Sequence, residues 1–572
     1  MSPFLNMSFR PKWALAALIW LTILLWGFLT LLASLSTPSS PFAYLVFSAV
    51  FLGLVVTGTF QRKSYGYFFL SLFLWLGFWL KYTLHILLNY PFVEPVGNFY
   101  GAGYGWYRSD LISPVSYSIG EKLNWDAVLW ASSCGAIGIV LAFFVFSLFT
   151  KRRAISPDRV HVPYWYARVR CRLWFAVVLT ITAAAITNSV LGIHQIGLVP
   201  RTVLPWPLNA LLSWWVSMGA AIAVGTMVYW DMKIGKSLVA PICAVLFEGF
   251  LSTVSLLSRG VYIFHVLPQL LALCGRYREI VGLGRKQIAL LIPIGIVLLL
   301  LSVVVVTTLR TQLYARESRN AIPVDVPTAS PSPNTADQRS WQQHILDEVI
   351  AEMKQRITSG QAMQKQLSLL IERRTELEGQ QIKAFGGGHT LKSDFLDSVR
   401  SVFRNLAQLA GDRWIGIEGV MAVQAYEAKS GHAFLAALTE RREIGKLTSY
   451  QIISNSPYSA MRSHRNQFAA LPGSTAFFLL SGSLWAVTAG MLVLGLVLLA
   501  FERLVLLLTS NPLQCALVGL AMANTIAQMG LSPRQDIPYY AMICVAILAI
   551  YAVQSRLLSV GLTRLKLQRE AK

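Results

Sequence analysis

The sequence predicts an all-α polytopic membrane protein with about 12 transmembrane helices and one large helical domain outside the membrane. Hydrophobic residues make up 55% of the 572 residues, and charged residues make up only 13%. Many windows of about 18 residues or more are largely apolar, long enough to cross a hydrocarbon core as helix. The alternating polar and apolar strands of outer-membrane barrels are missing from the sequence.

Nine spans are expected before a long hydrophilic segment and three after it. The first expected span follows Arg10 and Lys12, and positive residues before an apolar run are also typical of a signal peptide. Its apolar run is too long for the core of a signal peptide and has no clear cleavage site, so we interpret it as a retained span. The expected spans are 13–35, 42–60, 66–89, 126–149, 173–193, 208–230, 237–257, 261–275, 287–309, 479–503, 512–530 and 538–555.

Positive residues indicate the orientation of the spans. The segments on the side of the N-terminus carry 23 Lys and Arg residues, and the short loops on the other side carry five. Positive residues concentrate in cytoplasmic loops, so both termini are expected in the cytoplasm. The same bias explains most of the net charge of +22, which in a soluble protein would suggest a nucleic-acid partner. No nucleic-acid partner is expected here.

The chain divides into three parts at the hydrophilic segment. Residues 1–309 form a transmembrane bundle, residues 310–473 a helical extracytoplasmic domain, and residues 474–572 the last three spans with a basic cytoplasmic tail. Residues 320–338 are rich in Pro, Ser, Thr and Asn, which is typical of a flexible linker. A charged helical insertion is expected over 339–380.

Cysteine and histidine positions indicate neither a disulfide framework nor a metal site. The six cysteines lie in or beside predicted spans and cytoplasmic loops, and none lies in the hydrophilic segment. No CxxC or Cys/His pattern is present. We therefore expect no metal and no cofactor.

The most informative short stretch lies in the seventh predicted span. Glu248, Ser252, Ser255 and Arg259 are spaced so that one helix would carry all four on one face. A carboxylate inside a span is costly and usually faces a bundle interior or a water-filled cavity. The functional interpretation is a cavity lined by an acid and a guanidinium. A structural ion pair or a polar packing cluster explains the same spacing.

The third predicted span carries Lys81 and His85 near its outer end, one turn apart. Lys81 is a candidate for binding substrate at the membrane surface. The alternative is that its ammonium group simply reaches the interface, as lysines near helix ends do.

Several arginines are expected on the outer side, although they are far apart in the sequence. Arg310 closes the ninth span, and Arg534 lies in the last outer loop. Arg413 and Glu418 belong to one run with several glycines, and Arg465 follows His464 just before the tenth span. Arginine suits bidentate contact with phosphate oxygens, so these residues are candidates for binding a lipid-linked diphosphate. A solvated basic surface that touches anionic headgroups is the alternative.

Five stretches give the chain a resemblance to the Wzy-type oligosaccharide repeat-unit polymerases, of the O-antigen and capsule polymerase kind. They are the Glu-containing span that ends in Ser258-Arg259-Gly260, LGFWLK at 76–81, DRWIGIEGVMAV at 412–423, LPGSTAFFLLSGS at 471–483, and GLVLLAFERLVLLLTSNPLQCALVG at 495–519. The resemblance covers most of the chain loosely.

This resemblance implies a metal-independent glycosyltransferase of the GT-C type in the bacterial inner membrane. Such an enzyme acts on the periplasmic side, where it moves a growing glycan from undecaprenyl diphosphate to the non-reducing end of a lipid-linked repeat unit. A chain-length regulator and membrane lipids are the other implied partners. The implied diphosphate binders are Arg259, Arg310, Arg413 and Arg465, and the implied general bases are Glu248, Glu418 and His464. Lys81 and Arg534 are further candidates for binding the diphosphate or the substrate.

Three other functions stay open at this point, and one of them is a purely structural partner of a polysaccharide export complex. An O-antigen ligase shares the fold and the basic site but transfers finished polymer to a different acceptor. A flippase of lipid-linked oligosaccharide belongs to another class. One large outer domain and the lack of paired Gly/Pro-broken helices in two equivalent halves speak against a transporter.

Overall fold

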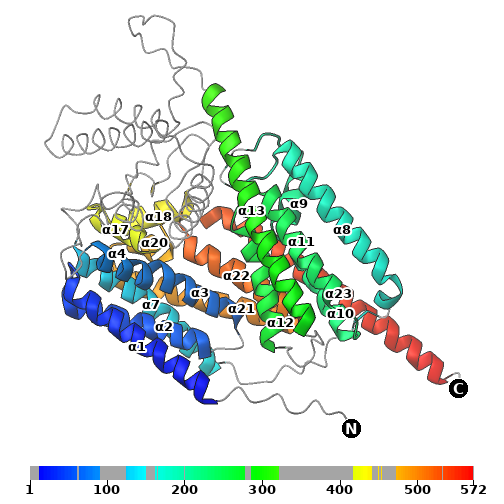
Figure 1. Ribbon diagram of the computed structural model, residues 1–572, viewed down its shortest axis with the longest axis horizontal. Helices are drawn as coiled ribbons and strands as arrows, with labels where there is room; N and C mark the ends of the chain where they lie inside the picture. The colour runs from blue at the N-terminus through cyan, green and yellow to red at the C-terminus, as the bar shows by residue number, and fades with distance from the viewer. Residues whose placement is uncertain are drawn as a thin grey trace, which may run out of the picture.

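The computed structural model describes a chain built from helices (Figure 1). The described residues are 12–60, 64–89, 124–149, 162–163, 165–196, 198, 200–276, 285–320, 416–440, 449, 453, 472–530 and 533–570. Within these ranges every element longer than one residue is a helix, which confirms the all-α class.

A first group of helices packs around an aromatic core. Tyr44, Phe47, Tyr67 and Trp79 lie at its centre and are at most 1% exposed. The third span is one continuous helix with a π-helical segment in its middle. The group consists of α1 (Lys12–Ser36), α2 (Pro41–Phe60), α3 (Tyr65–Leu74), the π-helix η1 (Trp75–Leu80), α4 (Lys81–Asn89), α7 (Trp125–Phe149) and α21 (Leu484–Thr509).

A second group packs around its own core beside the first. It consists of α8 (Tyr166–Leu191), α9 (Leu208–Trp214), the π-helix η3 (Trp215–Gly219), α10 (Ala220–Lys233), α11 (Val239–Ser255), α12 (Val261–Arg276) and α13 (Arg285–Asn320). Helix α22 (Pro512–Gln528) joins the groups because it packs against both α3 and α12. Helix α23 (Pro533–Glu570) lies against α21 and η3.

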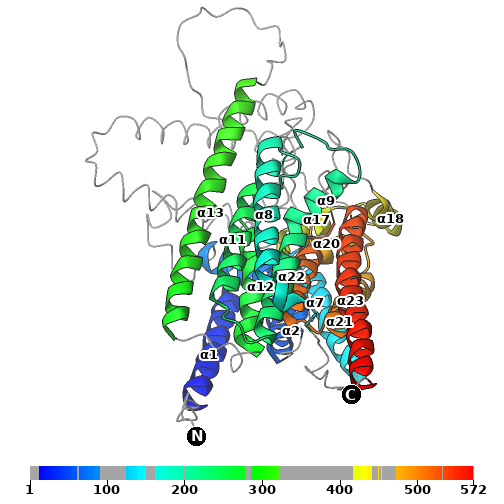
Figure 2. The same cartoon turned by 90° about the vertical axis from the view of Figure 1, so that its right-hand side faces the viewer.

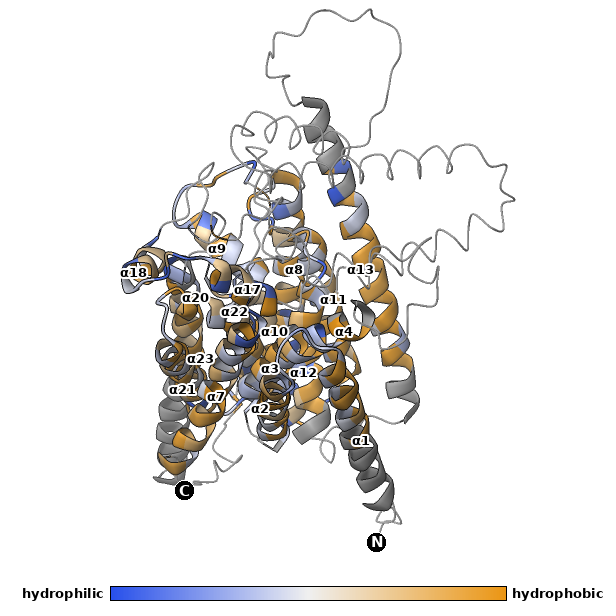
Figure 3. Ribbon diagram, turned by 90° about the vertical axis from the view of Figure 1, so that its left-hand side faces the viewer, coloured by the Kyte–Doolittle hydropathy of each residue, from blue (hydrophilic) through white to orange (hydrophobic). Residues whose placement is uncertain are grey.

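Seven helices in the described ranges are long and apolar enough to span a membrane. The other predicted spans are helical as well, in α1, α11, α12, α22 and α23. Between the two ends of the bundle, the helices consist mainly of hydrophobic residues (Figure 3). The structure therefore supports a membrane protein, and the count of 12 spans remains a prediction.

The predicted boundary at residue 310 is not a break in the structure, since α13 continues through it to Asn320. The tenth predicted span is wrong at its start. Gly482 has a φ of +77°, which interrupts the helix, and the side chain of Ser483 then caps a new one at Leu484. The residues before this break form the separate short helix α20 (Ser474–Leu479).

The start of α1 and the end of α23 lie at the same end of the molecule (Figures 1 and 2). We call this the terminal end. Helix α13 finishes at the opposite end, which we call the distal end. Two short helices from the hydrophilic segment, α17 (Ile417–Ala425) and α18 (Gly431–Thr439), lie on the distal side (Figure 1). The predicted insertion at 339–380 and most of the linker lie outside the described residues.

Two buried carboxylates have structural roles at the terminal end. Asp231, which is 0% exposed, accepts hydrogen bonds from Tyr166, from two nitrogens of Arg170 and from the indole of Trp174. This arrangement ties the end of α10 to the start of α8. The second carboxylate, Glu502 of α21, lies at the start of α3.

Glu502 caps the first turn of α3. Its carboxylate accepts hydrogen bonds from the Ser64 hydroxyl (2.5 Å), the Tyr65 amide (2.6 Å) and the Gly66 amide (3.0 Å). The amides at a helix start have no partner within the helix, and their dipoles favour a negative charge. Gly66 allows the close approach, because a Cβ there would meet Glu502, Leu498 and Gly519 at 2.8–3.1 Å.

The substitution Glu502→Gln is therefore expected to lower the free energy of unfolding by about 1–3 kcal/mol, since two charge-assisted bonds to backbone amides are weakened. Thermal unfolding of the purified protein in detergent measures this change. Arg503→Gln, at the next position, is the matched control and is expected to shift the midpoint little. Equal shifts for both variants would contradict the capping role.

Candidate functional site

The structure brings together two of the predicted site residues, Lys81 and Glu418. Their side chains form an ion pair between the membrane bundle and α17. The Lys81 side chain is 2% exposed and the Glu418 side chain is 18% exposed, so the carboxylate is the more accessible partner. Burying two charges is costly unless they are paired and hydrogen-bonded. The interpretation of Lys81 as a lysine that merely reaches the membrane surface is therefore wrong.

Each partner of this pair is held by unusual local structure. Lys81 directly follows the π-helix η1, and π-helical turns occur frequently at functional sites. Glu418 lies in the first turn of α17, where the helix dipole stabilises a carboxylate. Lys429 caps the other end of α17 by donating to the carbonyls of Gln424 and Tyr426, both at 2.7 Å.

Helix α17 is docked firmly against the bundle. Ile417, Val420 and Val423 are 0% exposed. Two glycines permit this approach, because a Cβ at Gly416 would meet Phe78 of η1 and a Cβ at Gly419 would collide with the Pro472 carbonyl. Helix α17 also packs against α20, which follows Pro472. Parts of three stretches that carry the family resemblance (76–81, 412–423 and 471–483) therefore meet at one place around the Lys81–Glu418 pair.

The second predicted acid, Glu248, lies near the middle of α11 and is 0% exposed. One of its oxygens accepts a hydrogen bond from Ser252 (2.8 Å), as the predicted spacing implies. The same oxygen lies 2.8 Å from Nδ1 of His265 on α12. The other ring nitrogen of His265 lies 2.9 Å from the carbonyl of Ser217 in the π-helix η3. Both π-helices thus adjoin a buried ionisable pair.

His265 is the residue that sequence reasoning missed. It belongs to no motif, and the only signal was a histidine inside a predicted span, one helix after Glu248. Because a carbonyl can only accept, Nε2 must carry a proton. One more proton lies between Nδ1 and Glu248, so the pair is neutral whichever side holds that proton.

The predicted alignment of Arg259 with Glu248 is wrong. Helix α11 ends at Ser255, and Leu257 adopts a left-handed φ of 49°, which turns the chain. Arg259 instead donates to Thr307 of α13 at 3.1 Å. Arg310, one turn further along α13, donates to the carbonyl of Ile196. Two predicted arginines therefore lie near one another at α13 toward the distal end: Arg259 is bonded to α13, and Arg310 is part of it.

Of the remaining predicted residues, the structure describes only the side chain of Arg534, and no bond from it to either pair occurs in the described ranges. Arg534 is exposed at the start of α23. Arg413, His464 and Arg465 lie outside the described residues, and so does the side chain of His85. No group of three or more His, Cys, Asp or Glu residues with the arrangement of a metal site occurs in the described ranges.

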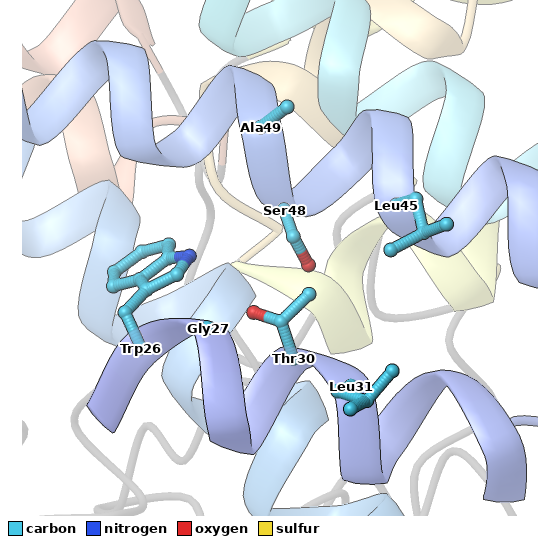
Figure 4. Close-up of a pocket in the computed structure, with 7 residues that line it drawn as sticks. All are labelled: Trp26, Gly27, Thr30, Leu31, Leu45, Ser48 and Ala49. Carbon is cyan, nitrogen blue, oxygen red and sulfur yellow. The ribbon is translucent and has the colours of Figure 1, made fainter. Parts of the chain in front are cut away.

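A groove of about 460 Å³ lies between α1 and α2 (Figure 4). Its lining contains the indole of Trp26 and the hydroxyls of Thr30 and Ser48, and the rest is apolar or glycine. Trp26 stacks on Trp79 of η1 with ring centroids 3.7 Å apart. The groove has no charged residue, so it does not provide the groups that a diphosphate or a proton transfer requires.

Comparison of the chain with models of protein families, with curated proteins and with solved structures finds no match.

Proposed function

We propose that the chain is a glycosyltransferase that extends a lipid-linked glycan, and that the Lys81–Glu418 pair is its reaction centre. The observation that carries the proposal is this buried pair, formed between a span and a short helix of the hydrophilic segment. Ionisable residues inside a membrane bundle usually mark a substrate site. The proposal includes the predicted arrangement of 12 spans, with cytoplasmic termini and the distal end in the periplasm of a bacterial inner membrane.

The two side chains supply complementary chemistry. Lys81 is a cation for the departing diphosphate, and Glu418 is a carboxylate for the acceptor hydroxyl. In the reaction, the hydroxyl oxygen attacks the anomeric carbon of the donor glycan, and the bond from that carbon to the diphosphate breaks. The electron pair leaves with the diphosphate, and the hydroxyl proton passes to Glu418. Positive charge at the leaving group stabilises the transition state.

The Lys81–Glu418 ion pair corresponds to the enzyme before substrate binds. When a diphosphate binds Lys81, Glu418 loses its partner and becomes available as a base. A polymerase also handles two lipid diphosphates, one on each substrate. A second cationic region in the other helix group consists of Arg259, which donates to Thr307 of α13, and Arg310 of α13 itself. Arg413 and Arg465 complete the set of proposed diphosphate binders, as does Arg534.

The rate of transfer is expected to depend on pH through Glu418. Burial raises the pKa of Glu418 above its ordinary value, and the charge of Lys81 opposes part of that rise. A general base acts only as the carboxylate, so transfer should fall as the pH decreases through this raised pKa. Initial rates measured across the acidic range test this. If the residual rate of the Glu418→Gln variant fell over the same acidic range as that of the wild type, Glu418 would not be the group that causes the fall.

The glycans of a deletion strain test the proposed function. Accumulation of single repeat units, with no ladder of longer chains, is the expected result. Long polymer left on the lipid carrier would instead identify the ligase. Repeat units trapped on the cytoplasmic side would identify the transporter and overturn the proposal.

A further inference from the structure

The second helix group and the start of α22 contain a series of buried polar side chains that the proposed transfer reaction does not use. Beginning at the distal side, Ser255 accepts a hydrogen bond from Asn188 of α8 (2.8 Å). One turn below on α11 is Ser252, which donates to Glu248, and Glu248 is bound to His265. All five residues are at most 3% exposed.

The series continues toward the terminal end along α12. Gln269, one turn after His265, donates to the His265 carbonyl at 3.0 Å. Its amide oxygen faces Gly225 of α10, where a Cβ would lie 3.0 Å from it. The Gly225 carbonyl accepts from Asn511 at the start of α22 (3.3 Å).

A last polar contact adjoins this one. Gln514 of α22 donates a hydrogen bond to Thr226 of α10 at 2.6 Å. Thr226 directly follows Gly225, and Gln514 lies three residues after Asn511. Gln269 and Gln514 are 0% exposed, Asn511 is 1% exposed and Thr226 is 5% exposed. We define the polar column as Asn188, Ser255, Ser252, Glu248, His265, Gln269, Asn511, Thr226 and Gln514.

Three acceptor oxygens in this column have no donor among the described residues. They are Oε2 of Glu248, Oε1 of Gln269 and Oε1 of Gln514. A buried acceptor without a donor is costly, and buried water molecules commonly satisfy such groups. The three oxygens occur at successive levels of the column, so water bound to them would link its polar groups into one chain.

We propose that the polar column carries protons across the membrane, with the Glu248–His265 pair as its central exchange site. The pair is neutral with one proton shared between Nδ1 and the carboxylate. A proton that arrives from water on one side makes the pair a protonated Glu248 with an imidazolium His265. Release of one proton to water on the other side restores the neutral pair, so no co-reactant is consumed.

The groups around the pair agree with this role. The ionisable and charged side chains described nearby are engaged elsewhere: Tyr262 donates to the Gly295 carbonyl, Arg259 donates to Thr307, and Asp231 is held by Arg170 at the end of α10. No ion pair from another charged side chain to Glu248 or His265 occurs in the described residues. The shared proton is therefore not fixed by a neighbouring charge.

Proton flux into proteoliposomes tests the proposal. The full-length protein is reconstituted with a pH-sensitive dye trapped inside, and a potassium gradient with valinomycin supplies the driving force. Wild-type vesicles are expected to acidify faster than empty vesicles. Gln269→Leu and Glu248→Gln are each expected to slow this flux by about tenfold or more, since each removes a hydrogen-bonding step.

Gln528→Leu is the matched control, because it makes the same change outside the polar column. Gln528 lies on α22, and its side chain is hydrogen-bonded only to Asn524 among the described residues. The flux of this variant should equal that of the wild type. Wild-type flux no greater than that of empty vesicles overturns the proposal, even if Gln269→Leu fails to fold. Equal flux in wild type and a folded Gln269→Leu also overturns it. Neither result bears on glycan transfer, which is measured separately.

Discussion

Replacing Glu418 by Gln is expected to lower the rate of glycan transfer by about 10²–10⁴-fold, the usual contribution of a general base. The amide keeps the shape of the side chain but cannot take the proton of the acceptor hydroxyl. The rate is measured as the appearance of extended glycan on the lipid carrier with the purified, reconstituted protein. Glu427→Gln makes the same change at an exposed position just after α17 and is expected to retain activity.

A loss of activity in Glu418→Gln also has a structural explanation, since the variant leaves Lys81 buried without its charged partner. The double variant Lys81→Met/Glu418→Met separates the loss of a catalytic base from the loss of stability. Apolar replacement of both members of a buried ion pair is often neutral or stabilising. We therefore expect the double variant to regain the thermal stability of the wild type and to remain inactive. A double variant that is both stable and active would show that the pair is structural only.

Replacing Asp231 by Ala is expected to have the largest effect on stability, about 3–5 kcal/mol lost from the free energy of unfolding. The variant removes the acceptor of four hydrogen bonds and leaves the Arg170 charge without its carboxylate. It also frees the end of α10 from the start of α8. Expression level and the midpoint of thermal unfolding measure the effect.

Two comparisons test this account of Asp231. Arg168→Ala, at an exposed position two residues before Arg170, should shift the midpoint little. Arg170→Met/Asp231→Leu removes both charges and should recover much of the lost stability, for the reason given for the Lys81–Glu418 pair. A midpoint for Asp231→Ala close to that of Arg168→Ala would contradict a clamp between α8 and α10.

The sequence predicted the helices better than the contacts between them. Hydropathy identified the helical ranges because each span is apolar along its own length. Lys81 and Glu418 were both predicted as site residues, each from the residues next to it in the sequence. Their pairing was not predicted, because nothing in two distant stretches of one sequence indicates that α17 docks beside η1.

Three other differences between the prediction and the structure have separate causes. The alignment of Arg259 with Glu248 assumed that the helix continues. The left-handed turn at Leu257 was not predicted, because residues 255–258 include no Gly or Pro. His265 was overlooked because a single histidine in an apolar helix has no characteristic spacing. Only the packing of α12 against α11 brings it to Glu248. Glu502 belonged to a stretch used for the resemblance, yet its role as the cap of α3 depends on a contact between distant spans.

A transfer reaction with purified components tests most directly whether the chain extends a lipid-linked glycan. Wild-type protein in proteoliposomes is mixed with a repeat unit linked to undecaprenyl diphosphate, and both the glycan length and the released undecaprenyl diphosphate are measured. The expected result is a ladder of longer glycans, with one undecaprenyl diphosphate released for each unit added, and neither product with Glu418→Gln. An unchanged repeat unit in the wild-type reaction, or a full ladder from Glu418→Gln, would contradict the proposed function.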